Sequence, residues 1–418
     1  MTRQGFALIL LALSIPLTAQ SGPKTNYSDL FQRIWQTVND DFYDPNFLGI
    51  SWTAVRKQYE PKAAAVSNDA EFATLMNQML HEIPVTHLAV RMPEKEGQSG
   101  IAVTTVEIAG KQLIASVANP SDAERRGLLP GDLLRTSWGN VRGDWGTLAD
   151  IDLEDCNGHA RTVSVLREPP GLPGRPSIRW RVIRPNPQRK IGYMQVVDFE
   201  DDVKDDFAPL VDKAMDELKE TDGLIIDVRN NPGGNLSALR LVSYFTPTPR
   251  FAVALLSRTF LQHFGNAPDQ MDPETIAKLP RITGAYSTPA IIDAMKRNGG
   301  GAAFYTEDVT PQYRGKIILL INEKTASAAE GFAGIMRGYP NTTLVGRTTM
   351  GAMVGAEDFT MPGGWILRFP THASWRADGR YWRDEPVVPD VQVPLTRQDL
   401  CNSWDGDLAK ALDLLGYK

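Results

Sequence analysis

Ser327 is the residue whose type and position first suggest chemistry. It lies in GKIILLINEKTASAAEGFAGIMR, residues 315–337, where the apolar run Ile317–Ile321 predicts a buried parallel strand and apolar residues at helical spacing after Ser327 predict a helix. A hydroxyl at such a strand-to-helix turn projects into the crevice where open α/β sheets bind ligands. The amide of Ala328, in the first helical turn, points toward the same space and can help to stabilise an oxyanion.

A structural role competes with this interpretation. Thr325 or Ser327 can simply cap the helix, and Glu330 can complete a capping box. Because capping serines are far more common than catalytic ones, this stretch taken alone favours the cap. A catalytic role for Ser327 therefore depends on partners elsewhere in the chain.

His87 is the candidate base, and it follows Thr86. A serine hydroxyl needs a neighbouring base, and imidazole, with a pKa of about 6.5, suits neutral pH. A carboxylate or hydroxyl on its other nitrogen would fix the tautomer. Without such partners, a lone histidine is more often a structural hydrogen-bonding residue.

A glycine turn supplies a second candidate oxyanion donor. Gly223–Val228 predicts a buried strand, Asn230–Gly234 the turn and Ser237–Tyr244 a helix. A phosphate-binding role is not favoured, because there is no GxxxxGK[ST] motif. The backbone amides of this turn can instead face an oxyanion.

The composition bounds the function classes. The chain has 418 residues, 42% of them apolar and 22% charged, with a net charge of −6, which indicates two or three domains and excludes non-specific binding of nucleic acid. Neither the two cysteines nor the five histidines have metal-ligand spacing, so we predict no metal and no cofactor. Whether Cys156 and Cys401 pair is left open by the sequence.

The first residues predict a signal peptide over residues 1–20. Arg3 gives a basic start, and the apolar run Phe6–Leu17 is too short to cross a bilayer. We expect cleavage near Ala19 or Gln20, a secreted or periplasmic protein, and no stable membrane insertion after cleavage.

Three further units must position the candidate residues. Residues 26–95 predict a helical domain that ends in the short strand Leu88–Met92, and residues 96–185 predict a β domain of short strands. Pro185–Lys190 is interpreted as a linker. Residues 186–418 predict an α/β core with a helix over Phe207–Leu218 and a long irregular insertion at 258–314. The predicted strands of the β domain are Ile101–Val106, Gln112–Ser116, Leu133–Ser137, Thr162–Leu166 and Ile178–Val182.

The β domain resembles a PDZ domain. The matching residues are the segment Pro120–Ala123, Gly127, Leu128 and the pair Gly131–Asp132. Such domains capture extended peptide ends by strand addition, which the resemblance would place at the loop Ser99–Ala102. The alternative is a β module that only packs as a lid.

The order of the core motifs resembles the C-terminal-processing (tail-specific) serine peptidase family. The motifs are GYMQVVDF, GLIIDVRNNPGGN, ILLINEKTASAAEGFAG, LVGRTTMG and VVPDVQV, with the PDZ-like segment upstream. The resemblance implies an α/β core of ββα repeats, of the tail-specific protease and crotonase-like type, acting on peptide or protein substrates. By residue, it implies Ser327 as nucleophile, with Ala328 and the Gly233–Gly234 turn as the oxyanion hole.

One position departs from the pattern of this family. Most members place a general-base lysine in the loop after the nucleophile helix, where this chain has Ala352. The tricorn branch instead uses a histidine preceded by a hydroxyl residue, together with a distant glutamate. The resemblance to that branch implies Thr86 and His87, with Glu385 favoured as the acidic residue and Asp384 as the alternative.

The sequence therefore predicts an exported serine endopeptidase that works by acyl transfer through a tetrad of Ser327, His87, Thr86 and Glu385. A preference for carboxyl-terminal peptide regions is implied only by the PDZ resemblance. Two alternatives rest on Ala352: a non-catalytic peptide-binding protein, or a Ser–Lys peptidase inactivated at that position. Substrate specificity and oligomeric state are not determined by the sequence.

Overall fold

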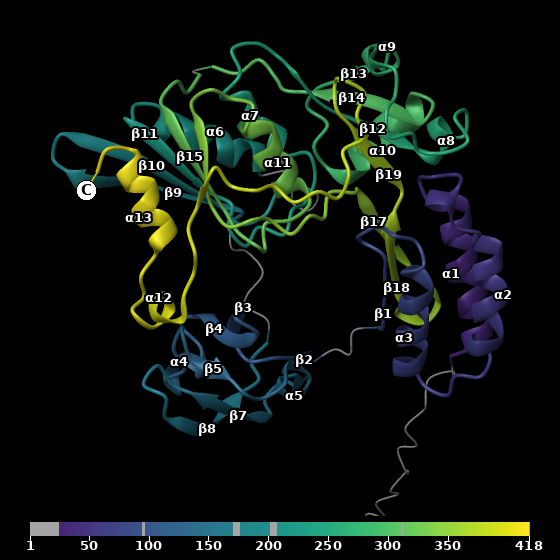
Figure 1. Ribbon diagram of the computed structural model, residues 1–418, viewed down its shortest axis with the longest axis horizontal. Helices are drawn as coiled ribbons and strands as arrows, with labels where there is room; N and C mark the ends of the chain where they lie inside the picture. The colour runs from purple at the N-terminus through teal and green to yellow at the C-terminus, as the bar shows by residue number, and fades with distance from the viewer. Residues whose placement is uncertain (1–24, 94–96, 170–175, 201–206, 311, 418) are drawn as a thin grey trace, which may run out of the picture.

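A core of two sheets carries a helical unit on one side and a small β module below it (Figure 1). The computed structural model describes residues 25–417 except 94–96, 170–175, 201–206 and 311, so the predicted signal peptide lies outside the described residues. Within this described part, no helix combines the length and the apolar character needed to cross a bilayer.

The larger core sheet has six strands in the order β20-β16-β15-β11-β10-β9, all parallel except β9. Alternate residues of the central strands face helices on opposite sides, which buries both faces as a parallel sheet requires. The strands are β9 (Ile178–Asn186), β10 (Arg189–Val196), β11 (Gly223–Asp227), β15 (Lys316–Ile321), β16 (Thr342–Gly346) and β20 (Val391–Gln392). The covering helices are α6 (Phe207–Leu218), α7 (Ala238–Ser243), α11 (Ala328–Met336) and α13 (Gly406–Leu414). The predicted strand and helix on either side of Ser327 are thus confirmed.

The second core sheet corrects the prediction for residues 258–314. Instead of an irregular insertion, this segment supplies two strands of a four-stranded sheet in the order β13-β14-β12-β19. The elements are β12 (Phe251–Ser257), α8 (Arg258–Leu261), α9 (Pro273–Ala277), β13 (Arg281–Ile282), α10 (Thr288–Arg297), β14 (Gly301–Tyr305) and β19 (His372–Trp375). Ile291, Ala294 and Met295 form the buried face of α10, a helical spacing that the many glycines and prolines of the segment obscured.

The helical unit consists of α1 (Tyr27–Asp41), α2 (Trp52–Ala63) and α3 (Asp69–Leu80), as the sequence predicts. Its buried side chains belong to the same hydrophobic cluster as core residues such as Trp365 and Phe369. The strand that follows, β1 (Ala89–Arg91), pairs antiparallel with β18 (Ile366–Pro370), which also pairs with β17 (Ala356–Thr360). The unit is therefore built into the core rather than tethered to it.

The β module, here residues 97–169, contains a five-stranded sheet in the order β3-β4-β5-β7-β8. The strands are β3 (Val103–Ile108), β4 (Lys111–Val117), β5 (Leu133–Leu134), β7 (Leu148–Glu154) and β8 (Ala160–Leu166); the flanking elements are β2 (Gln98–Ser99), α4 (Asp122–Arg125), α5 (Trp138–Val141) and β6 (Gly143–Asp144). The predicted strand at 178–182 is not part of it, because β9 pairs with β10 in the core sheet. The predicted linker Pro185–Lys190 accordingly covers the end of β9, the turn of that hairpin and the start of β10.

A disulfide between Cys156 and Cys401 joins the β module to α12 (Arg397–Cys401), which answers the question that the sequence left open. Arg397 adds four hydrogen bonds from its guanidinium to the module, to Gly131 O, Glu154 Oε1, Glu154 O and Asp155 O. Gly131 lies so close that a Cβ on it would be 2.5 Å from Cys401 Sγ. The module is therefore fixed to the end of the chain rather than free to swing.

We predict that the double variant Cys156→Ser/Cys401→Ser has a free energy of unfolding about 2–5 kcal/mol lower than the wild type, because the bridge closes a loop of 245 residues in sequence. Denaturant unfolding measures the difference, and a reducing agent should lower the stability of the wild type but not that of the variant. Equal transition midpoints for wild type and variant would contradict the prediction.

Candidate active site

Ser327 occupies a strained strand-to-helix turn between β15 and α11. Its backbone has φ 54° and ψ −124°, in the left-handed half of conformational space. Ser121 and Thr396, which cap other helices of this chain, have ordinary extended backbones with φ −157° and φ −114°. A helix cap alone therefore does not require this conformation, whereas a nucleophile elbow does.

The capping box predicted for Glu330 is present, but its carboxylate also binds further residues. Glu330 is completely buried and accepts hydrogen bonds from Ser327 N (3.1 Å), Thr349 Oγ1 (2.5 Å), Gly351 N (2.6 Å) and Ala352 N (2.7 Å). A buried carboxylate is costly unless donors surround it, and here four do. Glu330 thus links the turn at Ser327 to the loop that begins at Thr349.

The two glycines of the predicted oxyanion turn have different roles. Gly233 donates its N–H to Asn231 Oδ1 (2.8 Å), and a Cβ on it would lie 2.6 Å from the Cβ of Ser327. Within the described residues, the N–H groups of Gly234 and Ala328 donate to no acceptor. Gly233 therefore permits the close approach of the two turns, and Gly234 and Ala328 carry the free amides.

Thr86, His87 and Asp384 form a chain of hydrogen bonds. The Thr86 hydroxyl donates to Asp384 Oδ2 (2.7 Å), and the Thr86 amide donates to the same oxygen (3.0 Å). Because its proton points to Asp384, the hydroxyl can only accept from His87 Nδ1, 3.0 Å away. This places the imidazole proton on Nδ1 and leaves Nε2 unprotonated, as a general base requires.

Asp384 makes the contact that the sequence analysis assigned to Glu385. Its Oδ1 also accepts from the amides of Met353 (2.6 Å) and Val354 (3.0 Å). Glu385 is exposed, and no hydrogen bond joins its carboxylate to Thr86 or His87 in the described structure. In this irregular segment, Asp384 rather than the adjacent Glu385 therefore binds Thr86.

His87 is held by strand pairing and has a strained backbone, with φ 62°. It lies two residues before β1, in which Ala89 pairs with Arg368 of β18. Asn77 of α3 exchanges two side-chain hydrogen bonds with the backbone of Val90, at 2.8 and 3.0 Å, which fixes β1 to the helical unit. His87 thus belongs to the helical unit, and its position relative to the core is fixed by the pairing of β1 with β18.

The pKa of His87 is lowered from its ordinary value. Burial is the largest cause, and the positive charge of Arg368 adds to it, while the negative charge of Asp384 acts in the opposite direction. The imidazole is consequently neutral at neutral pH, which is the form that can take up a proton.

Ala352, the position that carries a lysine in most of the resembling family, is a buried part of the same loop. Lys324, close to Ser327 in sequence, donates to Thr105 O of the β module instead. Arg347 is likewise paired, with Glu323 and Asp407. In the described residues, the contacts of Lys324 and Arg347 therefore direct both side chains to partners other than Ser327.

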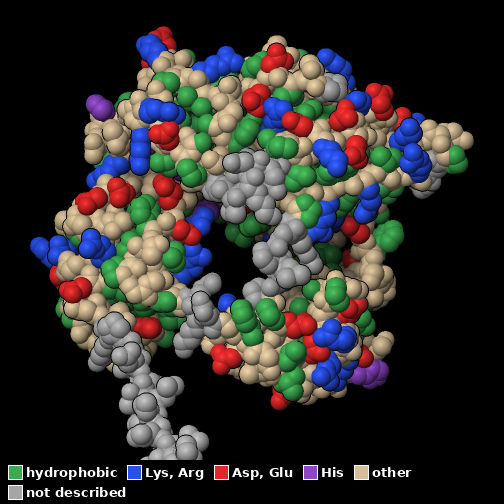
Figure 2. Space-filling view, turned by 180° about the vertical axis from the view of Figure 1, so that it is seen from behind, with side chains coloured by type: hydrophobic (Ala, Val, Ile, Leu, Met, Phe, Trp, Pro, Cys, Tyr) green, Lys and Arg blue, Asp and Glu red, His purple; other side chains and the backbone are tan. Residues whose placement is uncertain are grey.

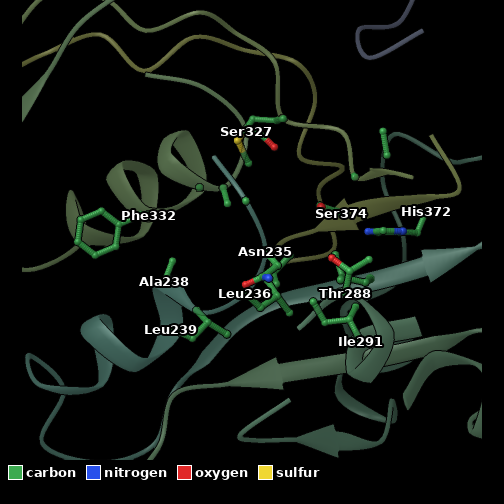
Figure 3. A pocket seen from close by; sticks show the side chains of 18 of the residues that line it. Asn235, Leu236, Ala238, Leu239, Thr288, Ile291, Ser327, Phe332, His372 and Ser374 are labelled. Carbon is green, nitrogen blue, oxygen red and sulfur yellow. The ribbon is translucent and has the colours of Figure 1, made fainter. Parts of the chain in front are cut away.

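A pocket that is partly open to solvent begins at Ser327 (Figure 3). It lies between α11 on one side and the sheet formed by β12 and β19 on the other, with α7 and α10 closing it. Most of its wall is apolar; the contributing side chains include Leu236, Leu239, Val253, Leu255, Ile291, Phe332, Ile335, Met353 and Trp382. Gly234, Ala328 and Arg368 also line it, whereas His87 does not.

Sequence reasoning missed several residues of the site. It gave His372 no role, although this side chain lines the pocket, and it did not identify Arg368. A usable signal was present, because Thr371–His372 repeats the dipeptide Thr86–His87. Glu330 was assigned only a helix cap, since its contacts with the 349–352 loop depend on tertiary structure.

Parts of the chain match two protein-family models. Residues 190–393 match the model of peptidase family S41, and residues 23–81 match the tricorn protease C1 domain. A probable CtpA-like serine protease of Staphylococcus aureus (strain COL) is 22% identical over 397 residues, which cover 91% of this chain and 68% of that protein. A putative tricorn protease homolog 2 of Streptomyces coelicolor is 24% identical over 417 residues, 90% of this chain but 31% of that protein.

Solved structures show the same fold at low sequence identity. The photosystem II D1 C-terminal processing protease has a TM-score of 0.56 and 16% identity, covering 90% of this chain and 97% of that one. Mature CPAF complexed with lactacystin has a TM-score of 0.59 and 15% identity, covering 94% and 98%. The chain thus contains a peptidase family S41 domain preceded by a tricorn protease C1 domain, and it is a serine-type peptidase.

Proposed function

We propose that this peptidase cleaves peptide bonds with Ser327 as nucleophile and His87 as general base, oriented by Thr86 and Asp384. The observation that carries the proposal is the hydrogen-bonded chain from Asp384 through Thr86 to His87 Nδ1, which leaves Nε2 free to act. A continuous loop joins this chain to the serine turn. Glu330 binds the loop at 349–352 and Asp384 binds it at 353–354.

In the proposed mechanism, Ser327 Oγ attacks the carbonyl carbon while its proton passes to His87 Nε2. The amides of Gly234 and Ala328 donate to the resulting oxyanion, and Asp384 stabilises the imidazolium through Thr86. The proton then moves from His87 to the leaving amine as the carbon–nitrogen bond breaks. A water molecule, deprotonated by the same imidazole, hydrolyses the acyl-enzyme and restores Ser327.

Peptide and protein substrates can reach the site from the open space between the core, the helical unit and the β module. Figure 2 shows an opening between these parts, with Lys and Arg side chains at its edge. β3, the strand after the loop Ser99–Ala102, is an edge of the sheet in the module and can accept an added peptide strand. This supports a preference for carboxyl-terminal regions of substrates.

Ala352 does not favour the alternative of an inactivated Ser–Lys enzyme. Its amide donates to Glu330 and its side chain is 6% exposed, so a lysine there would have to fit its chain into a packed loop. The complete Thr86–His87–Asp384 chain also speaks against a non-catalytic binding protein, since binding alone needs no oriented base. Export is part of the proposal, and the disulfide is consistent with an oxidising compartment.

Two adjacent carboxylates provide the first test. We predict that Asp384→Asn lowers kcat/KM for a peptide substrate by at least about tenfold, because the chain that fixes the tautomer of His87 loses its charge. Glu385→Gln, the matched control one residue later, should retain nearly full activity. Equal losses in the two variants, or a larger loss in the Glu385 variant, would contradict the assignment of Asp384.

The pH dependence of kcat/KM follows from the lowered pKa of His87. Activity requires the neutral imidazole, so it is present above this pKa and is lost as the pH falls through it; the acidic limb should therefore lie below about pH 6.5. Arg368→Gln removes a charge that lowers this pKa, so the limb should move to higher pH, whereas Arg368→Lys should leave it in place. An identical limb in the Gln and Lys variants would exclude His87 as the titrating base.

A substitution at Gly233 tests how closely the glycine turn approaches the turn at Ser327. Gly233→Ala should abolish turnover, because the new Cβ would lie 2.6 Å from the Cβ of Ser327 and the backbone has φ 106°. Gly299→Ala, at φ 67° with no atom within 4 Å of its Cβ, is the matched control for backbone strain alone. Circular dichroism should report folded protein for both variants, and full turnover by the Gly233 variant would contradict the geometry.

A further inference from the structure

A second chain of threonine, histidine and carboxylate lies beside the pocket. The Thr371 hydroxyl donates to Glu357 Oε1 (2.5 Å) and stands 3.2 Å from His372 Nδ1. The arrangement repeats that of Thr86, His87 and Asp384, but it faces a different space, because His372 lines the pocket and His87 does not.

The hydrogen bonds fix the tautomer of His372. Since the Thr371 proton points to Glu357, the hydroxyl accepts from His372 Nδ1–H, and Nε2 carries a lone pair. Burial lowers the pKa of His372 to about 4, so the ring is neutral under ordinary conditions. No donor in the described residues pairs with Nε2, and Figure 3 shows the ring extending from β19 into the pocket.

His372 therefore gives a largely apolar pocket an acceptor that has no partner in the described structure. The ring lies on the same face of β19 as Ser374, across the pocket from α11. A purely apolar side chain entering this pocket would cover Nε2 without giving it a proton, which carries the cost of an unpaired buried acceptor. A side chain that is apolar along its length and ends in a donor would satisfy both parts of the wall.

The chemistry of the reaction indicates which substrate residue the pocket receives. The base must later protonate the leaving amine, so the leaving side of the substrate lies toward His87. The pocket lacks His87 but includes Gly234 and Ala328, whose free amides face the carbonyl oxygen in the proposed mechanism. The pocket is therefore on the acyl side of the cleaved bond.

We propose that this pocket holds the side chain on the acyl side of the scissile bond and that His372 makes it select tyrosine over phenylalanine, through a hydrogen bond from the phenol to Nε2. This inference rests on the proposed function. Thr371 is the positioning residue, because it keeps the proton on Nδ1.

The test compares paired peptides that differ only in Tyr or Phe at the cleaved position, with kcat/KM measured for each and the cleavage site read by mass spectrometry. The wild type should favour Tyr by about tenfold or more, as expected for one hydrogen bond to a buried acceptor. His372→Phe should bring the Tyr/Phe ratio to about one or below. Thr371→Val should lower the ratio because the tautomer is released, and Thr371→Ser should preserve it.

The ratio is taken within each variant, so a general loss of folded enzyme cancels. A wild-type ratio near one, or a ratio that His372→Phe leaves unchanged, would overturn the proposal. Ser374→Ala is the comparison on the same strand face: a loss of selectivity in this variant but not in the His372 variant would also overturn it.

A binding experiment separates this proposal from the proposed mechanism. Calorimetry on Ser327→Ala protein measures binding of N-acetylated peptide amides that end in Tyr or Phe; the terminal amide avoids capture of a free carboxylate by the β module. Tighter binding of the Tyr peptide that depends on His372 supports the pocket assignment even if the wild type cleaves nothing. Equal binding of both peptides would contradict it even if cleavage occurs.

Discussion

The catalytic assignment depends on two carboxylates that hold one loop from opposite ends. Glu330 accepts hydrogen bonds from Ser327, Gly351 and Ala352, and Asp384 accepts from Met353, Val354 and Thr86. Backbone amides are fixed donors, so each carboxylate is satisfied only when the loop takes this one path. Residues 349–354 thereby connect the turn at Ser327 to the hydrogen-bonded group around His87, although these two residues are 240 positions apart in sequence.

The same constraint explains why the helical unit is packed into the core. His87 comes from this unit, and its position is set by the pairing of β1 with β18 and by a shared hydrophobic cluster. The strained backbones of Ser327 and His87 are maintained because the surrounding contacts fix them, which is the usual condition for strain at functional sites. The proposed proton transfer requires an imidazole in a fixed position, which a loosely tethered unit could not provide.

Local patterns in the sequence predicted the serine turn, the helix after it, the glycine turn and the helical unit, because each is encoded within a few consecutive turns or strands. Tertiary side-chain contacts were beyond such reasoning. Asp384 and Glu385 are adjacent and alike in charge, and only the path of the irregular segment decides which one reaches Thr86. Likewise, Gly233 and Gly234 differ in role only because Asn231 occupies one amide. For segment 258–314 the prediction of an irregular insertion is wrong, because its glycines and prolines obscure the helical spacing of the buried residues of α10.

Labelling with a fluorophosphonate probe, read by intact mass, tests the central claim most directly. Such a probe reacts only with a serine hydroxyl that a neighbouring base activates. If His87 activates Ser327, one label should add to the wild type and none to Ser327→Ala or His87→Ala. Undiminished labelling of the His87 variant would show that another group is the base, and unlabelled wild type would contradict a catalytic role for Ser327.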